Sequence, residues 1–146
     1  MRPTPKGWPR LSTAIFYNDG HAAIDWLCHA FGFEARLVVK GDDGRLEHSE
    51  LTLDDALIMV GVAAREETPY QRSPLSVGGA NTQVACFHID DVDGHCARAR
   101  AAGARIVREP TTSDYGEDYW ADRTYEAVDP EGHHWYFMQR MRTGGG

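Results

Sequence analysis

An internal repeat is the feature that most constrains how this chain folds. Helix-start signals at Asp19 and Asp91 lie 72 residues apart, and the glycines placed to end the two helices, Gly32 and Gly103, lie 71 apart. A repeat of this kind fixes the architecture before any single motif does. Two copies are too few for a solenoid array, so the spacing predicts one domain, residues 1–146, assembled from two similar units.

Each copy has the pattern of a strand, a helix and three further strands. Apolar residues recur at helical spacing after each capping aspartate and alternate with polar residues elsewhere. The expected strands cover 11–17, 33–39, 47–53 and 56–62 in the first copy, and 82–89, 104–108, 119–128 and 134–140 in the second. We therefore predict an α+β fold of two βαβββ repeats, over about 9–62 and 82–140, joined by a linker over 63–81.

Composition limits the classes of partner. The chain has 42% hydrophobic and 25% charged residues, as in ordinary globular proteins. It has no apolar run near the roughly 18 residues that span a bilayer, and no secretory signal, so we expect a cytoplasmic protein without membrane contacts. The net charge of −7 argues against nucleic-acid binding. It favours a neutral or cationic small molecule, or serves only solubility.

Three segments carry a resemblance to a known family. They are NDGHAAIDWLCHAFGFE at 18–34, DDVDGHCARARAAGARIV at 90–107 and WADRTYEAVDPEGHHWYF at 120–137. In this order and spacing they resemble the vicinal oxygen chelate superfamily, which includes glyoxalase I, bleomycin resistance proteins and extradiol dioxygenases. The resemblance covers about residues 9–140. It implies a curved mixed sheet around a cavity and a homodimer.

The resemblance also implies where a metal would sit. Enzymes of the superfamily hold a divalent metal with two side chains from each unit, and these positions fall on Ser12, Met59, Val84 and Tyr136. Such metals prefer imidazole and carboxylate ligands, which these residues do not provide. A shift of one residue would not restore the site, because neighbouring side chains point to the opposite face of a strand. We therefore expect no metal and no other cofactor.

Strand parity predicts which side chains line the cavity. An apolar set suits the helix-covered face: Leu51, Leu53, Ile58, Val60, Phe87, Trp135 and Phe137. The opposite parity and a WGDR-like family segment give the candidate ligand contacts: Phe16, His48, Glu50, Met59, His88, Trp120, Arg123, His134 and Tyr136. This mixture of apolar, aromatic and a few polar groups is typical of a small-molecule site.

Several of these candidates have alternative roles. His48 and Glu50 share one strand face, where they would transfer protons, grip a cation, or form a solvated pair. With His88 and His134 they would make a displaced metal site. Arg123 would clamp an anionic ligand or pair with a neighbouring carboxylate.

Three functions stay open from the sequence. The first is a metal-free protein that binds small molecules and sequesters an antibiotic or toxic metabolite, in keeping with the bleomycin-resistance branch. The second is a glyoxalase-like lyase or isomerase that uses His48, Glu50 and Arg123 with no metal or a displaced one. The third is an interaction domain. For the first, we expect a planar aromatic ligand with a basic group that Glu50 binds. If Arg123 binds the ligand instead, we expect a carboxylate- or phosphate-bearing metabolite.

Overall fold

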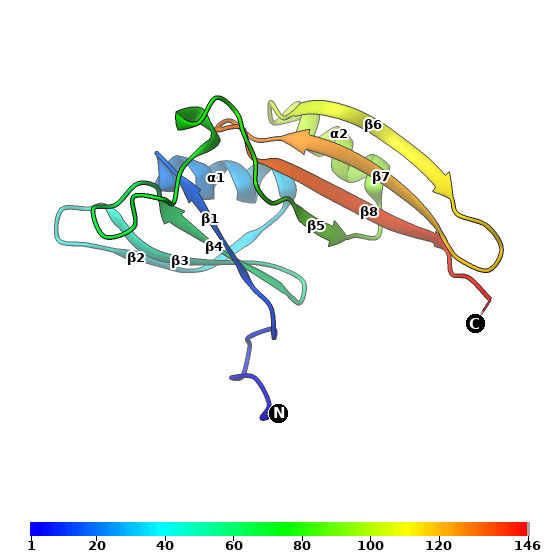
Figure 1. Cartoon of the computed structure of the whole chain (residues 1–146), viewed down its shortest axis with the longest axis horizontal. Coiled ribbons are helices and arrows are strands. Elements are labelled where there is room, and N and C mark those ends of the chain that lie inside the picture. The colour runs from blue at the N-terminus through cyan, green and yellow to red at the C-terminus, as the bar shows by residue number, and fades with distance from the viewer. Residues whose placement is uncertain (146) are drawn as a thin grey trace. The chain divides into compact units, whose positions relative to one another are not determined.

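The computed structural model describes residues 1–145 of the chain. They divide into two compact units, Met1–Val77 and a second from residue 78 onward, which we call unit 1 and unit 2. Each unit has one helix and one four-stranded sheet (Figure 1). The predicted α+β architecture of two βαβββ repeats is therefore confirmed.

Unit 1 follows the predicted order of elements. It consists of β1 (Thr13–Tyr17), α1 (Gly20–Phe31), β2 (Glu34–Lys40), β3 (Leu46–Leu53) and β4 (Ala56–Val62). The sheet order is β1-β4-β3-β2, with β1 parallel to β4 and the other pairs antiparallel. The sheet is thus mixed and open at both edges.

The predicted helix signals work as expected in α1. The Asp19 carboxylate accepts a hydrogen bond from the Ala22 backbone N–H at 3.0 Å, which satisfies one of the free donors of the first turn. At the other end Gly32 adopts a left-handed conformation with φ of 80°. Between these caps, Leu27 and Phe31 are fully buried and anchor the helix on its sheet.

Unit 2 repeats the pattern with one difference. It consists of β5 (Ala85–His88), α2 (Val92–Ala101), β6 (Arg105–Asp114), β7 (Ala121–Val128) and β8 (His134–Arg142), in the sheet order β5-β8-β7-β6. Strand β6 continues well beyond the predicted end at residue 108. Two register shifts, between Ile106 and Arg108 and between Arg108 and Thr111, allow it to pass Pro110.

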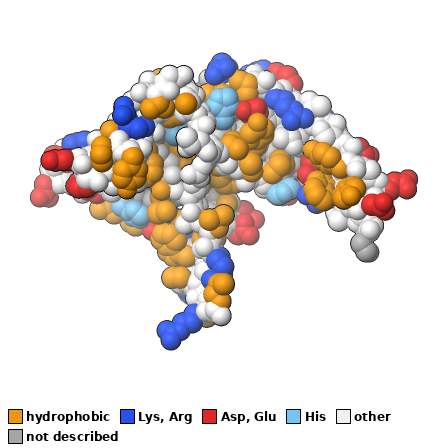
Figure 2. Space-filling model, viewed as in Figure 1, with side chains coloured by type: hydrophobic (Ala, Val, Ile, Leu, Met, Phe, Trp, Pro, Cys, Tyr) orange, Lys and Arg blue, Asp and Glu red, His pale blue; other side chains and the backbone are white. Residues whose placement is uncertain are grey.

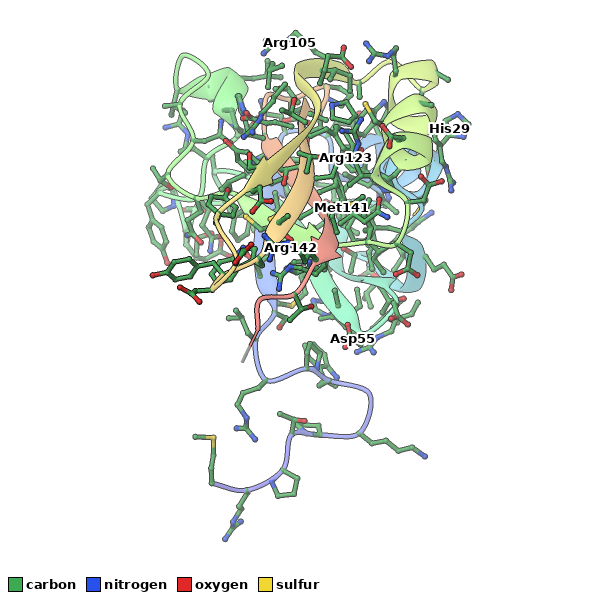
Figure 3. The ribbon with its side chains drawn as sticks, turned by 90° about the vertical axis from the view of Figure 1, so that its right-hand side faces the viewer. His29, Asp55, Arg105, Arg123, Met141 and Arg142 are labelled. Atoms are coloured by element: carbon green, nitrogen blue, oxygen red, sulfur yellow. The ribbon has the colours of Figure 1, made fainter. Side chains whose placement is uncertain are left out.

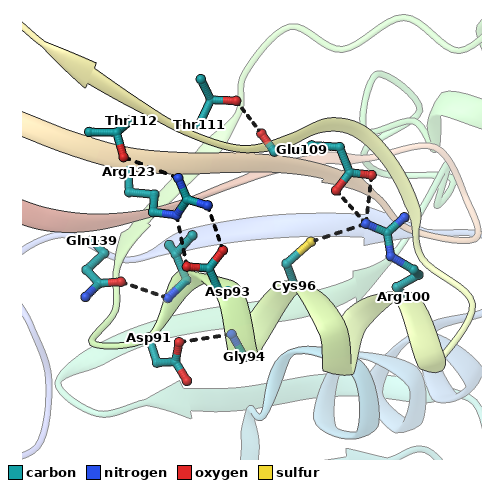
Figure 4. A network of polar contacts seen from close by, with 11 residues as sticks. Asp91, Asp93, Gly94, Cys96, Arg100, Glu109, Thr111, Thr112, Arg123 and Gln139 are labelled. Atoms are coloured by element: carbon teal, nitrogen blue, oxygen red, sulfur yellow. Dashed lines mark hydrogen bonds and ion pairs between the residues drawn. The ribbon is translucent and has the colours of Figure 1, made fainter.

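Side chains fix α2 to its sheet. Asp91 caps the helix by accepting from the Gly94 N–H at 3.0 Å, and Gln139 of β8 accepts from the Val92 N–H at 3.1 Å (Figure 4). Beneath the helix, Trp135 and Phe137 are fully buried and their rings stack. In the part of the chain that the structure describes, no helix is long and apolar enough to cross a membrane.

Residues of the expected linker belong to the two units. In unit 1 the Ala63 N–H donates to the Tyr17 carbonyl at 2.8 Å, and a short 3-10 helix, η1 (Pro74–Ser76), follows. In unit 2 the Asn81 side chain accepts from the His134 N–H and donates to the Gly132 carbonyl. Backbone and side-chain hydrogen bonds therefore hold both ends of the segment.

Candidate functional site

Each sheet has a helix on one face, and we call the other its open face. Helix α1 packs on β4, and α2 packs on β6 and β7. The apolar set predicted for the helix-covered face is buried, except for half-buried Leu53: Leu51, Ile58, Val60, Phe87, Trp135 and Phe137. Strand parity therefore assigned this face correctly, and the candidate site belongs on the open faces.

The open face of unit 1 includes Phe16 and Met59. Phe16 of β1 lies opposite Gly61 of β4, and Ala14 lies opposite Met59. A Cβ atom added at Gly61 would come within 2.9 Å of the Phe16 ring, so the glycine allows the ring to lie close to the strand. Phe16 and Met59 are both half-buried and provide the apolar part of this surface.

Glu50 lies at the centre of a polar cluster in unit 1. Arg36 Nε donates to Glu50 Oε2 at 2.7 Å, and His48 Nε2 lies 3.3 Å from Glu50 Oε1. Only 8% of Glu50 is exposed. The hydrogen bond from Arg36, and then that from His48, hold the pKa of the Glu50 carboxyl below its ordinary value. Glu50 is already paired, which removes the main argument for a cationic ligand.

Arg36 was absent from the sequence-based site because no face had been assigned to β2. The register between β2 and β3 shifts between Ala35 and Leu37, which places Arg36 in a bulge. The pair before it, Ala35 with Leu51, brings Arg36 next to Glu50 on the neighbouring strand. The same guanidinium donates to the Gly7 carbonyl at 2.5 Å and lies 5.1 Å from the Trp8 ring. It therefore ties the N-terminal segment to this edge of the sheet.

A groove of about 590 Å³ runs along this segment. It is lined by residues 4–9 and by Arg36, Thr52, Leu57 and the β3–β4 hairpin. Asp55 of this hairpin is labelled in Figure 3. Thr52 and Leu57 belong to the open face by parity. The groove is thus continuous with the open face of unit 1.

The Arg36→Met variant tests whether the pair of Arg36 and Glu50 stabilises the protein in a pH-dependent way. Because the pair lowers the folded-state pKa of Glu50, it stabilises the protein above the unfolded-state pKa, and this contribution disappears as the pH falls through the folded-state pKa. We expect a loss of about 1 kcal/mol near neutral pH. Urea unfolding over a pH series should show that the difference in free energy of unfolding between the variant and wild type becomes smaller in acid. The exposed Arg45→Met is the control, and a gap independent of pH would contradict the coupling.

A second cluster lies on the open face of unit 2. Glu126 of β7 is opposite Tyr136 of β8. His134 Nδ1 is 2.6 Å from Glu126 Oε1, and the Tyr136 hydroxyl also donates to Glu126. Burial and the nearby Glu126 charge raise the pKa of Tyr136, while Arg108 opposes this. His134 and Tyr136 were predicted site residues, and the structure brings them together around Glu126.

The far end of the same open face holds His88 and Trp120. Arg140 Nε donates to Asp122 Oδ1 at 2.5 Å, and its guanidinium lies 5.2 Å from the Trp120 ring. His88 and Arg140 line a pocket of about 240 Å³. Along β8, Met138 separates this end from the Glu126 cluster.

Arg123 does not share this surface. It lies on the helix side of β7, where Nε and Nη2 donate to the two carboxylate oxygens of Asp93 on α2 at 2.9 and 2.8 Å (Figure 4). Its neighbours of the same parity, Tyr125 and Ala127, are fully buried. The expectation that Arg123 lines the cavity was wrong because no face had been assigned to β7. Its salt-bridge partner is Asp93.

The superfamily's metal positions can be compared with the structure. In unit 1, Ser12 lies two residues before Ala14, which pairs with Met59; in unit 2, Val84 lies two residues before Cys86, which pairs with Tyr136. Ser12 and Val84 thus directly precede β1 and β5, and Met59 and Tyr136 belong to the strands that pair with these two. Their hydroxyl, thioether, isopropyl and phenol groups do not fit a divalent metal of this family.

The displaced metal site does not form within either unit. His48 and Glu50 belong to unit 1, whereas His88 and His134 belong to unit 2. Within each unit of the described residues 1–145, no three His, Cys, Asp or Glu side chains are grouped to hold a metal ion.

Ion pairing is the common property of the two open faces. The sequence indicated Glu50 as the only carboxylate, but Glu126 and Asp122 also lie there, each with a basic partner. Acidic, basic and histidine side chains are interspersed over the visible surface (Figure 2). If the register of the β7–β8 hairpin had been extended along both strands, the sequence would have placed Glu126 and Asp122 on the open face.

Comparison with known proteins identifies relatives over most of the chain. A family model for the Glyoxalase/Bleomycin resistance protein/Dioxygenase superfamily matches residues 11–137. The uncharacterized proteins Mb0911c of Mycobacterium bovis and Rv0887c of Mycobacterium tuberculosis are each 30% identical over 139 residues. The matches cover 92% of this chain and 85% and 76% of the two relatives, respectively.

Solved structures agree with this assignment. TioX from Micromonospora sp. ML1 superposes with a TM-score of 0.70 at 30% identity, covering 91% of this chain and 99% of TioX. TnmS3, an antibiotic binding protein from Streptomyces sp. CB03234, superposes with a TM-score of 0.62 at 17% identity. The superposition covers 88% of this chain and 93% of TnmS3, which shows a shared fold. With two βαβββ units and a family match over most of its length, the chain belongs to the Glyoxalase/Bleomycin resistance protein/Dioxygenase superfamily.

Proposed function

We propose that this protein binds a small molecule on the open faces of its sheets without a metal ion, and sequesters an antibiotic or toxic metabolite. The observation that carries the proposal is the set of side chains at the superfamily's metal positions, which offer no imidazole or carboxylate: Ser12, Met59, Val84 and Tyr136. Apolar and aromatic groups of this kind suit binding by burial and stacking.

One structural relative supports a binding role. TnmS3, which has the same fold, is an antibiotic binding protein. A fold shared with a binding protein does not fix the ligand, so the ligand class has to come from the side chains of this chain.

Ion pairing on the open faces favours an uncharged aromatic ligand. Glu50, Glu126 and Asp122 each have a basic partner, so a ligand cation would have to compete with arginine or histidine for them. Arg123 is engaged by Asp93 on the helix side and offers nothing to a ligand anion. Stacking on Phe16, Trp120 or Tyr136 needs no charge.

The alternative enzymatic function has less support. A glyoxalase-like reaction run by His48, Glu50 and Arg123 needs a competent base and a cation at one site. Arg36 lowers the pKa of Glu50, which makes the carboxylate a weaker base. Arg123 lies in the other unit, on the helix face of its sheet.

Native mass spectrometry of the purified protein tests the proposal. We expect the mass of a homodimer, the assembly that the family resemblance implies, with no divalent metal at one ion per chain. After addition of planar aromatic antibiotics, we expect a retained adduct. Elemental analysis after dialysis checks the metal independently. One metal ion per chain, or the absence of any aromatic adduct at micromolar concentrations, would count against this function.

A further inference from the structure

A polar cluster on the open face of unit 2 consists of Glu126, His134 and Tyr136. The donors and acceptors within this cluster determine which hydrogen-bonding group a ligand must provide. An ionised carboxylate only accepts hydrogen bonds. The 2.6 Å contact therefore makes His134 Nδ1 the donor and Glu126 Oε1 the acceptor. In the neutral imidazole, the second ring nitrogen, Nε2, is then an acceptor.

His134 Nε2 is available to a ligand. No partner for it occurs among the residues that the structure describes, and 31% of the His134 side chain is exposed. The Tyr136 hydroxyl uses its hydrogen in the bond to Glu126, so its oxygen keeps lone pairs that accept. The cluster thus presents two acceptors at the surface, and a ligand must bring the hydrogen.

The residues around the cluster favour an uncharged donor on an aromatic ring over an ammonium group. Arg108 of β6 lies opposite Glu126, so the charge of this carboxylate is offset and an ammonium group gains little net attraction. Next to Tyr136 on the same face are Cys86 of β5 and, two residues along β8, Met138. An aromatic ring packs well against this thiol, thioether and phenol surface.

The geometry points to an aromatic hydroxyl group as the ligand feature that this cluster recognises: the ring lies over Tyr136 and Met138, and its O–H donates to His134 Nε2, held in place by Glu126. Hydrogen bonding would thus occur beside Tyr136, one of the positions where metal-binding relatives place a ligand to the ion. This inference rests on the proposed binding function and adds the chemical class of its ligand.

A matched pair of probes tests the inference: 2-naphthol and its methyl ether, 2-methoxynaphthalene, which keeps the rings and loses the donor hydrogen. Binding of each is measured by isothermal titration calorimetry above neutral pH with the full-length protein. We expect 2-naphthol to bind about tenfold more tightly than the ether, the difference made by one ligand hydrogen bond. Equal affinity for the two probes would overturn the inference and leave the binding function standing, whereas binding of neither would overturn both.

Variants locate the effect. His134→Phe keeps a ring of similar size and removes the acceptor, so the two probes should bind it equally. Glu126→Gln, which no longer holds the imidazole by a charge, should reduce the preference several-fold. The control is His29→Phe on the exposed surface of α1 (Figure 3), which should keep the tenfold preference. A preference that survives His134→Phe in a protein with unchanged circular dichroism would show that the hydroxyl binds elsewhere.

Discussion

Replacing Asp129 with alanine should lower the free energy of unfolding by about 4 kcal/mol, because it strips the acceptor from several buried donors at once. In the turn before β8, Asp129 Oδ1 accepts from the backbone N–H groups of Glu131 and His133, both at 3.0 Å. Its Oδ2 accepts from the Trp135 indole N–H at 3.1 Å, and Trp135 is fully buried. Urea or thermal unfolding followed by circular dichroism measures the loss.

Two further variants refine the Asp129 test. Asp129→Asn keeps one oxygen for the backbone donors but turns an amide N–H toward the indole N–H. It should therefore lower the free energy of unfolding by about half as much as Asp129→Ala. Asp42→Ala, at an exposed position in a turn of unit 1, should change stability little. If Asp129→Ala is no more destabilising than Asp42→Ala, this turn does not hold unit 2 together as described.

The Ser49→Ala variant should cost about 3 kcal/mol, because two buried main-chain groups lose their partner. Ser49 is fully buried in β3, and its hydroxyl donates to the Val60 carbonyl at 2.7 Å while accepting from the Val60 N–H at 2.9 Å. At this position the Ser49 side chain replaces the backbone hydrogen bonds that would otherwise join β3 and β4. Chemical denaturation compares the variant with wild type.

The control for Ser49 is Ser76→Ala, the same chemical change at an exposed hydroxyl whose contact with Asn18 is 3.3 Å long. It should alter stability by well under 1 kcal/mol. Equal losses in the two variants would mean that β3 and β4 re-form a main-chain pairing at Val60 when the hydroxyl is absent.

Elements that depend on local chemistry were predictable from the sequence. Both capping aspartates, Asp19 and Asp91, accept the expected backbone hydrogen bonds, and Gly32 ends its helix in the left-handed conformation. Period-two alternation likewise identified the buried faces of β4 and β8. These features depend on neighbours within a few residues, so a single sequence contains the information.

What the sequence did not reveal depends on strand pairing. Arg36 was missed because no face was assigned to β2, although the pairing of Ala35 with Leu51 brings Arg36 next to Glu50. Arg123 was placed in the cavity from a family-like segment without a face for β7, although the fully buried Tyr125 and Ala127 share its parity. The groups that pair across strands, Glu126 with His134 and Asp122 with Arg140, likewise require the register of β7 against β8.

The irregular outer strands also bear on how the protein behaves when it is concentrated. Strands β2 and β6 end their sheets, and an unpaired strand edge is a template on which other chains add to build fibrils. The risk is real for β2, where Leu37, Val38 and Val39 are exposed. Breaks in register along both strands, with Pro110 in β6, interrupt the regular row of donors and acceptors that an incoming strand would need. The bulge at Arg36 therefore makes the edge of β2 a poorer template for aggregation.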